Sequence, residues 1–257
     1  RDHLKDSVSP KWQALALGVS KGETVNVGAK DQIRFPPLPG VRDELSGIVR
    51  DENRSGAQTG VLPGTVLLDA GFTAEAMKNT LRLQGNQQSF KLVHIASHFN
   101  FEPGDETKSF LLLGGGKTLP LSELKKMNQV FSKVELLTLS ACNTATGGEA
   151  NGKEVEGFAV LAQRQGAQAI IASLWPVSDS STSQLMQQFY RLRDERPGTS
   201  KAEAMRQAQL KLLHPAGQQA IADGQKNNTQ SSFKADPKAP FAHPYYWAPF
   251  ILIGNWR

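Results

Sequence analysis

Short apolar runs recur along the chain and are separated by stretches with helical spacing. Each run is rich in Val, Ile and Leu and is bounded by Gly, Pro, Ser or Asn, which is typical of buried β-strands. The predicted strands begin at Trp12, Thr65, Phe90, Val134, Ala167 and Ala248.

The stretches between the runs repeat their apolar residues with the period of a helix. The predicted helices begin at Val41, Thr73, Leu121, Glu154, Ser180 and Ser200. Thr73, Ser122 and Ser200 are predicted N-caps, and Gly166 is a predicted helix stop. Alternating strands and helices predict an α/β fold with a mostly parallel central sheet that is flanked by helices on both faces.

Two segments depart from this alternation. "SFLLLGGGKTLPL", residues 109–121, predicts a small hairpin insertion between two core strands, and the polar residues 214–242 have no period and predict a loop. No linker divides the chain, so residues 1–257 are predicted to form a single domain. Because the first residue is Arg1 rather than Met, we expect the domain to be excised from the C-terminal part of a larger protein.

Composition narrows the class of protein. At 257 residues and 39% hydrophobic content the chain can bury a substantial core, and no apolar run reaches membrane-spanning length. The single cysteine, Cys142, cannot form an internal disulfide, which favours a reducing, cytoplasmic setting. The net charge of +5 comes from interspersed basic and acidic residues, so neither nucleic acid nor a membrane is an expected partner.

Three patterns resemble known chemistry without completing it. "GVSKG" from Gly18 matches a serine-hydrolase motif, but the prolines that follow exclude the helix the motif requires. "GGGKT" from Gly114 lacks the first glycine of a phosphate loop. His94 and His98 lie four residues apart on a predicted strand, roughly 13 Å at ~3.3 Å per residue, too far to share a metal ion. We therefore predict no metal and no cofactor.

His98 and Cys142 each follow a predicted strand. Ligands and catalytic groups of an open parallel sheet collect beyond the carboxyl ends of its strands, so both side chains are expected at one edge, where a substrate can reach His98. His94 lies inside its strand and is predicted to be hydrogen-bonded core support. A free cysteine is often a small buried hydrophobe, but Cys142 leads into a turn-forming, Gly-rich segment that favours a presented side chain.

Five ordered motifs carry a family resemblance. "HIASH", "LSACNT", "IIASLWPVSD", "SKAEAMRQAQLKLL" and "HPYYWAPFILIGN" together resemble the CHAT domains, bacterial caspase-like peptidases related to separase in the clan of caspases and gingipains. The similarity runs from about Leu62 through Asn255. It implies a caspase-like fold and a catalytic dyad carried by His98 and Cys142, with the backbone amides of Cys142 and Phe99 as oxyanion donors.

Two positions leave alternatives open. The residue after the histidine is often glycine in the clan, so Phe99 implies either a rebuilt turn or a different second donor. Asp179 ends the "LWPVSD" segment, which in separase-type proteins lines the pocket for the P1 residue and implies a preference for Arg or Lys. The same position fits the N-cap of the following helix.

The leading hypothesis is a cytoplasmic cysteine endopeptidase that acts on a protein or peptide substrate as the effector domain of a larger bacterial protein. The family implies an upstream regulatory region, with helical repeats as one form. One alternative is a catalytically silent caspase-like scaffold that binds partners. A second is a nucleotide-binding domain that uses Lys117 and the glycine turn from Gly114 to Gly116.

Overall fold

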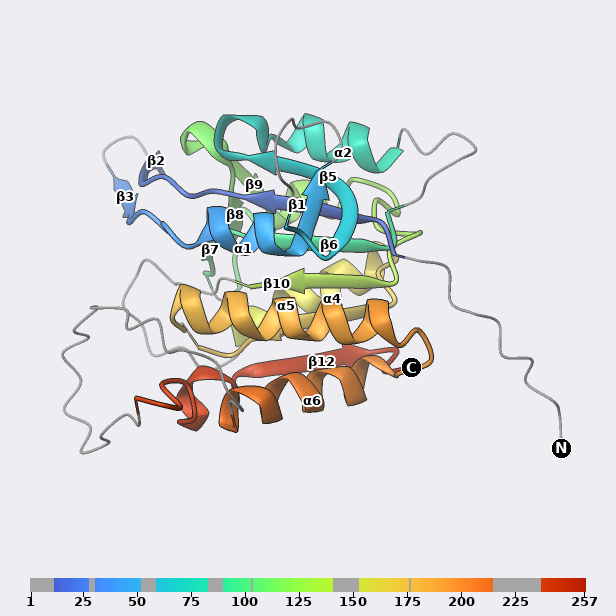
Figure 1. Cartoon of the computed structure of the whole chain (residues 1–257). Helices are drawn as coiled ribbons and strands as arrows, with labels where there is room; N and C mark the ends of the chain where they lie inside the picture. Colours follow the sequence, from blue (N-terminus) through green and yellow to red (C-terminus); the bar gives the residue numbers. More distant parts are fainter. Residues whose placement is uncertain are drawn as a thin grey trace, which may run out of the picture.

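The computed structural model describes residues 12–27, 31–51, 59–82, 90–102, 104–140, 153–175, 177–214 and 237–257. A seven-stranded sheet forms the centre of this part of the chain (Figure 1). Its strand order is β12 (Phe250–Gly254), β11 (Ala169–Ser173), β10 (Leu136–Leu139), β6 (Leu92–Ala96), β1 (Ala14–Gly18), β5 (Leu62–Leu68) and β4 (Val49–Asp51).

The prediction of a mostly parallel sheet is confirmed. The strands β4, β5, β1, β6, β10 and β11 pair in parallel, and β12 alone runs antiparallel to its neighbour β11. Five of the six predicted apolar runs each contain one of these strands, whereas the run from Thr65 covers only the second half of β5, which begins three residues earlier. The three-residue β4 was not predicted, because so short a segment shows no alternation that could be distinguished from the end of a helix.

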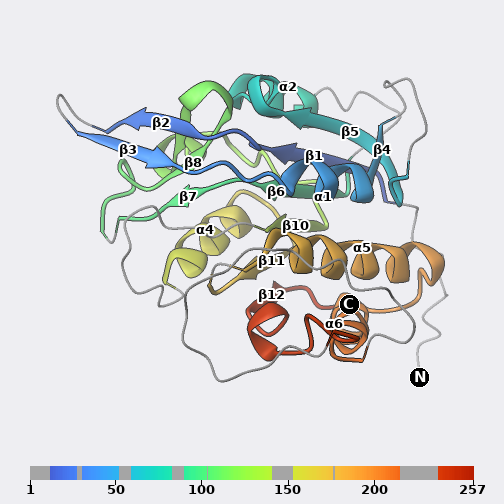
Figure 2. The same ribbon diagram turned by 60° about the vertical axis from the view of Figure 1, so that its left-hand side comes forward.

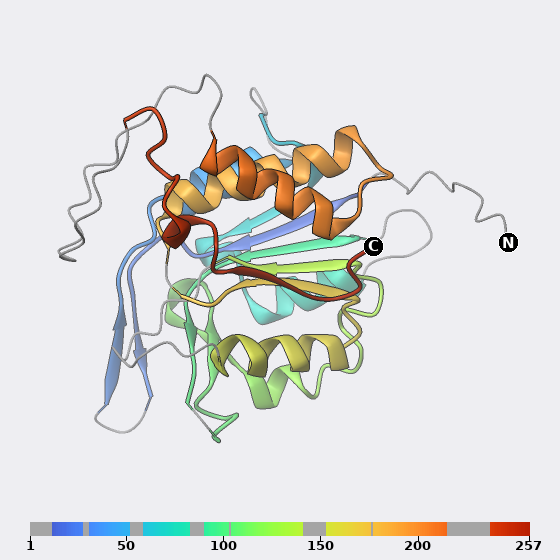
Figure 3. The same cartoon turned by 90° about the horizontal axis from the view of Figure 1, so that it is seen from below.

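Helices cover both faces of the sheet, as predicted (Figure 3). On one face lie α1 (Val41–Ile48), α5 (Asp179–Glu195) and α6 (Lys201–Leu213), and on the other α2 (Ala74–Arg82), α3 (Leu121–Leu124) and α4 (Lys153–Arg164). Side chains alternate between the two cores along each strand. In β6, Val93 and Ile95 enter the core beneath α2 and α4, whereas Leu92 and Ala96 enter the core beneath α1 and α5.

Three of the predicted helix signals are confirmed. Thr73 Oγ1 accepts a hydrogen bond of 3.0 Å from the amide of Ala76, and the Ser200 side chain accepts one of 3.1 Å from Glu203. Gly166, with φ of 102°, adopts the left-handed conformation that ends α4. Ser122 was wrongly predicted as a cap, because α3 already begins at Leu121.

Two small antiparallel units accompany the main sheet. The predicted insertion is confirmed: β7 (Phe99–Asn100), β8 (Phe110–Leu112) and β9 (Thr118–Pro120) form a three-stranded sheet, with the turn η2 (Gly114–Gly116) between β8 and β9. The hairpin of β2 (Glu23–Asn26) and β3 (Gln32–Phe35) was not predicted. It follows β1 directly and extends beyond the end of that strand (Figure 2).

The parallel strands end along one edge of the sheet. We call this the carboxyl edge; it comprises the last residues of β1, β5, β6, β10 and β11, namely Gly18, Leu68, Ala96, Leu139 and Ser173. The arrowheads of β1 and β10 point toward it in Figure 1. Separately, no helix within the described ranges is long and apolar enough to cross a membrane.

Candidate active site at the carboxyl edge

His98 lies just beyond the end of β6, at the carboxyl edge. Its backbone carbonyl accepts a hydrogen bond of 2.9 Å from the amide of Leu112 in β8. The hydroxyl of Ser97 donates to the Leu112 carbonyl at 2.7 Å. The insertion therefore holds the histidine backbone in place immediately after the strand that delivers it.

The imidazole of His98 is oriented by the last residue of β3 and the residue that follows it. Nε2 lies 2.8 Å from the carbonyl oxygen of Pro36, and the ring packs against Phe35 with 5.2 Å between ring centroids. A carbonyl oxygen can only accept, so Nε2 carries a hydrogen and donates it. In the neutral imidazole this leaves Nδ1 as the basic nitrogen.

The Pro36 carbonyl is a part of this site that the sequence did not indicate. It lies 62 residues before His98 in the chain. The prolines of "FPPLP" were informative only as helix breakers. A backbone carbonyl has no side-chain signature, so only the tertiary structure reveals which one meets the histidine.

One expectation about His98 is wrong in the described structure. The sequence placed this side chain where a substrate could reach it, but its exposed fraction is 0%. The β2–β3 hairpin accounts for part of this burial, since Phe35 and Pro36 lie against the ring.

The backbone of Phe99 answers the conformational part of the question raised by the missing glycine. The residue lies in β7, and its φ is not in the left-handed region, so the turn is built without the conformation that favours glycine. Its side chain is 1% exposed and packs edge-to-face on Phe158 of α4, with 5.5 Å between ring centroids. The aromatic ring contributes to the core that anchors the insertion.

The backbone N–H of Phe99 points away from the β7–β8 ladder. In an antiparallel pair, hydrogen-bonded and non-hydrogen-bonded residue pairs alternate. Phe99 is opposite Leu111, and the bond from Leu112 to His98 belongs to the neighbouring pair. Phe99 therefore occupies a non-hydrogen-bonded position, and β8 does not use its N–H.

Ser140 and Ser173 lie at the ends of neighbouring strands. The amide of Ser140 donates to the Ile95 carbonyl at 2.9 Å, which continues the pairing of β10 with β6 to the carboxyl edge. The hydroxyls of Ser140 and Ser173 are buried, and neither has a hydrogen-bond partner among the residues that the structure describes. Cys142 follows Ser140 by two positions and lies outside the described residues.

Asp179 is the first residue of α5, which begins six residues beyond the end of β11. Ser178 is the N-cap of this helix, so the capping position predicted for Asp179 is displaced by one residue. The structure describes the backbone of Asp179 but not its side chain. A contact of this carboxylate with substrate stays a prediction.

His94 lies in the middle of β6 and is fully buried, as predicted for a core histidine. Its Nε2 is 2.9 Å from Glu44 Oε1 in α1, and its Nδ1 is 2.9 Å from the Tyr190 hydroxyl in α5. The same hydroxyl lies 2.8 Å from Thr138 Oγ1 in β10. Burial raises the pKa of Tyr190, and the charge of Glu44 raises it further against the opposing hydrogen bond of Thr138, so the side chain stays a phenol.

The glycine turn at Gly114–Gly116 does not resemble a phosphate site. The amide of Gly115 donates to the Glu23 carboxylate at 3.1 Å, so a negative charge already lies where a phosphate would bind. Gly114 packs so tightly on the backbone of Asp69 that an added Cβ would lie 1.7 Å from the Asp69 oxygen. The turn therefore serves packing. In the described part of the chain, no group of three or more His, Cys, Asp or Glu side chains is arranged to hold a metal ion.

This fold and this edge define a class of protein: an α/β domain of caspase-like architecture in which a histidine follows one central strand and a cysteine-bearing segment follows the next. The CHAT domain family matches residues 2–255, nearly the whole chain, and the chain belongs to that family.

Other comparisons add little to this assignment. No curated protein matches the chain. Among solved structures, a pyridoxal kinase from Staphylococcus aureus in complex with pyridoxal is 9% identical, over 76% of this chain and 85% of its own, with a TM-score of 0.32. A putative phosphomethylpyrimidine kinase from Bacteroides thetaiotaomicron is 11% identical, over 95% of this chain and 100% of its own, with a TM-score of 0.31. Similarity this low supports no statement about fold or function.

Proposed function

We propose that this CHAT domain is a cysteine endopeptidase in which His98 and Cys142 form the catalytic dyad. The observation that carries the proposal is the hydrogen bond from Nε2 of His98 to the Pro36 carbonyl. A nucleophile needs a base, and an effective base is itself oriented by a third group. Pro36 fills that third role and leaves Nδ1 as the nitrogen able to accept the thiol proton.

Chain connectivity supports the pairing with Cys142. β10 is the immediate neighbour of β6, and Leu139 is opposite Ile95 near the carboxyl edge. Cys142 follows Ser140 by two residues, a separation of at most about 7 Å along an extended chain. A cysteine tethered this closely to the end of β10 is within reach of a histidine that follows β6.

The proposed reaction proceeds by acyl transfer. The Cys142 thiol gives its proton to Nδ1 of His98, and the thiolate attacks the scissile carbonyl. The protonated imidazole then donates to the leaving amine, and water hydrolyses the thioester with the same histidine as base. A free thiol of ordinary pKa, about 8.5, is only a few per cent ionised at neutral pH, so the nearby base contributes directly to the rate.

The tetrahedral intermediate needs aimed N–H donors for its oxyanion. The amide of Phe99 is a suitable candidate, because its strand position leaves the N–H unused by β8. The amide of Cys142 is the proposed second donor. Asp179, at the start of α5, is proposed to favour Arg or Lys in the P1 position through a charge-assisted hydrogen bond.

The burial of His98 favours a second candidate function. Its 0% exposure means that a peptide cannot meet the imidazole without displacing part of the chain over it. A domain that never opens would be a catalytically silent scaffold that binds partners. A domain that opens on a signal from an upstream region of a larger protein would be a regulated peptidase, and this is the version we favour.

Covalent labelling tests the proposal. A fluorescent acyloxymethyl ketone peptide with Arg in P1 alkylates a nucleophilic thiolate, so we expect labelling of the intact chain and none of Cys142→Ala. Labelling of His98→Ala should fall about 10²-fold or more, the lower end of what a positioned base contributes. His214→Ala, which removes an exposed histidine after α6, is the matched control and should label like the wild type.

Peptide-library cleavage follows the labelling. If the intact chain neither labels nor cleaves, even after activation by limited proteolysis or by mild denaturant, the scaffold is the better description. If His98→Ala labels at the wild-type rate, the dyad is wrong.

A further inference from the structure

His98 is held by two units of the chain, the segment after β3 and the β7–β9 insertion, and Asp69 makes contacts that connect it to both. The side chain of His98 is held by Pro36, and its backbone is held by the insertion through Leu112. Asp69 directly follows β5 and lies on neither unit. Its side chain nevertheless binds the segment that follows β1, and its backbone contacts the turn that follows β8.

The conformation of Asp69 is unusual. Its φ is 51°, in the left-handed region that residues other than glycine seldom adopt, and the residue is 7% exposed. Such a conformation persists when its surroundings determine it, and it is found preferentially near functional sites. The surroundings in this case are a set of hydrogen bonds to the carboxylate.

The carboxylate of Asp69 anchors the segment that follows β1. Its Oδ1 accepts from the backbone amide of Ser20 at 2.7 Å and from the Ser20 hydroxyl at 2.9 Å, and Arg42 of α1 forms an ion pair with the other oxygen. Ser20 in turn accepts a hydrogen bond of 3.0 Å at its carbonyl from the amide of Leu38. Leu38 is two residues beyond Pro36, so the chain of contacts ends at the carbonyl that orients His98.

The backbone of Asp69 contacts the second unit. Gly114, in the turn that follows β8, packs directly on the Asp69 carbonyl, where no side chain would fit. The Gly114 amide donates to Phe72 at 3.0 Å, and the Phe72 amide donates to Asp69 at 2.9 Å. The strand that leads into this turn contains Leu112, which binds the His98 carbonyl.

Asp69 is ionised at neutral pH. Burial raises the pKa of its carboxyl group, but the hydrogen bonds from Ser20 and the charge of Arg42 outweigh burial and keep the pKa below its ordinary value. Hydrogen bonds to an ionised acceptor are stronger than those between neutral groups. The hydrogen bonds from Ser20 to Asp69 are therefore charge-assisted, and Ser20 in turn binds Leu38, two residues beyond Pro36.

We propose that Asp69 is a positioning residue for His98, which acts through Ser20 and Leu38 to hold the Pro36 carbonyl against Nε2–H. The inference rests on the proposed peptidase function for its catalytic meaning. The effect of Asp69 on the position of the His98 imidazole can also be measured in a protein that has no peptidase activity.

Exchange of the ring Nε2–H proton with water is the measurement, made by NMR on the intact chain with ¹⁵N-labelled histidine. Asp69→Asn keeps a residue type that tolerates the left-handed conformation but removes the charge. We expect exchange at His98 to accelerate about tenfold or more, the order expected when a hydrogen bond to a charged group is weakened. Ser20→Ala removes one of the bonds and should give a smaller change in the same direction.

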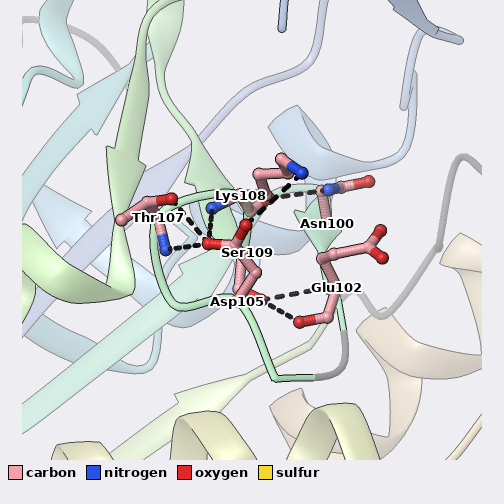
Figure 4. Close-up of polar contacts among 6 residues, drawn as sticks. All are labelled: Asn100, Glu102, Asp105, Thr107, Lys108 and Ser109. Atoms are coloured by element: carbon pink, nitrogen blue, oxygen red, sulfur yellow. Dashed lines mark hydrogen bonds and ion pairs between the residues drawn. The ribbon is translucent and has the colours of Figure 1, made fainter.

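Two controls separate positioning from general loosening. His94 is buried in the same strand and bonded to Glu44, so its ring proton should exchange at the wild-type rate unless the whole domain has been destabilised. Asp105→Asn alters another well-bonded aspartate, whose Oδ1 accepts from the amides of Thr107 at 2.9 Å and Lys108 at 3.2 Å in the loop between β7 and β8 (Figure 4). The hydrogen bonds of Asp105 stay within its own loop, so we expect this variant to leave the exchange rate of His98 unchanged.

Activity provides a separate readout. If the peptidase proposal holds, kcat of Asp69→Asn should fall about 10²-fold, the cost of a small misplacement of a catalytic group, with a smaller effect on KM and a shifted pH profile. Unchanged exchange at His98 in folded Asp69→Asn and Ser20→Ala would overturn the positioning role, whatever the activity. Faster exchange in Asp69→Asn and Ser20→Ala would support the positioning role. If the wild type then neither labels nor cleaves a peptide library, even after activation, the positioning role stands and the peptidase proposal fails.

Discussion

Replacing Tyr190 with Phe tests whether the buried network around His94 stabilises the packing of α1 and α5 on the central sheet. The Tyr190 hydroxyl lies 2.9 Å from His94 Nδ1 and 2.8 Å from Thr138 Oγ1, and it links α5 to β6 and β10. All three side chains are fully buried. Phe fills the same space without the hydroxyl, so the substitution removes two hydrogen bonds and creates no cavity.

The expected cost follows from the groups left behind. His94 Nδ1 and Thr138 Oγ1 would each lose a buried partner, at ~1–3 kcal/mol for an unsatisfied group, and the easier burial of Phe offsets part of this. We expect Tyr190→Phe to lower the free energy of unfolding by about 2–4 kcal/mol. Thr138→Val removes the Thr138 hydroxyl, one of the two groups that lose their hydrogen-bond partner in Tyr190→Phe. The double variant should therefore lose less stability than the sum of the two single variants, by roughly 1 kcal/mol or more.

Urea unfolding followed by circular dichroism and by tryptophan fluorescence gives these energies, provided that the two probes coincide and the m-value is constant. Tyr246→Phe is the matched control, because this half-buried tyrosine has no hydrogen bond from its hydroxyl within the described residues. A Tyr190→Phe protein within about 0.5 kcal/mol of the wild type, with additive energies in the double variant, would refute the network as a source of stability.

The remaining predictions concern stability and specificity. His94→Ala should lower the free energy of unfolding by about 3 kcal/mol or more, since it leaves Glu44 buried without its partner, and urea unfolding measures this. Ser200→Ala should cost ~1 kcal/mol through loss of the α6 cap; an unchanged unfolding midpoint would show that the cap contributes nothing. The folded-state pKa of Asp69 is depressed, so its contribution to stability is present above the unfolded pKa, near 3.8, and is lost as the pH falls through the folded value; unfolding energies measured from pH 6 to pH 2 should therefore decline less steeply in Asp69→Asn. Asp179→Ala should shift cleavage away from Arg and Lys in P1, and an identical library profile would leave this residue only its place in the first turn of α5.

The pattern of residues predicts much of this architecture because each element carries its own signal. The strand that contains His94 is otherwise apolar, with β-branched Val93 and Ile95 on either side of the histidine, which is typical of a strand covered on both faces. The same reasoning distinguishes the two histidines, since four residues along a strand separate a side chain in the covered interior from one beyond its end. The β2–β3 hairpin was missed because its strands are short and half-exposed, and a pattern of period two needs more residues to be visible.

The sequence alone therefore determined the α/β class, the alternation of strands and helices, and the placement of His98 beyond a central strand, because all of these depend on local periodicity. Only the tertiary structure decided what holds that histidine. Pro36 lies far away in the chain and binds the histidine through its backbone carbonyl. Asp69 is also remote from this carbonyl in sequence and is connected to it through Ser20 and Leu38. Contacts of this kind depend on where folding brings the backbone, and no pattern of side chains along the chain encodes them.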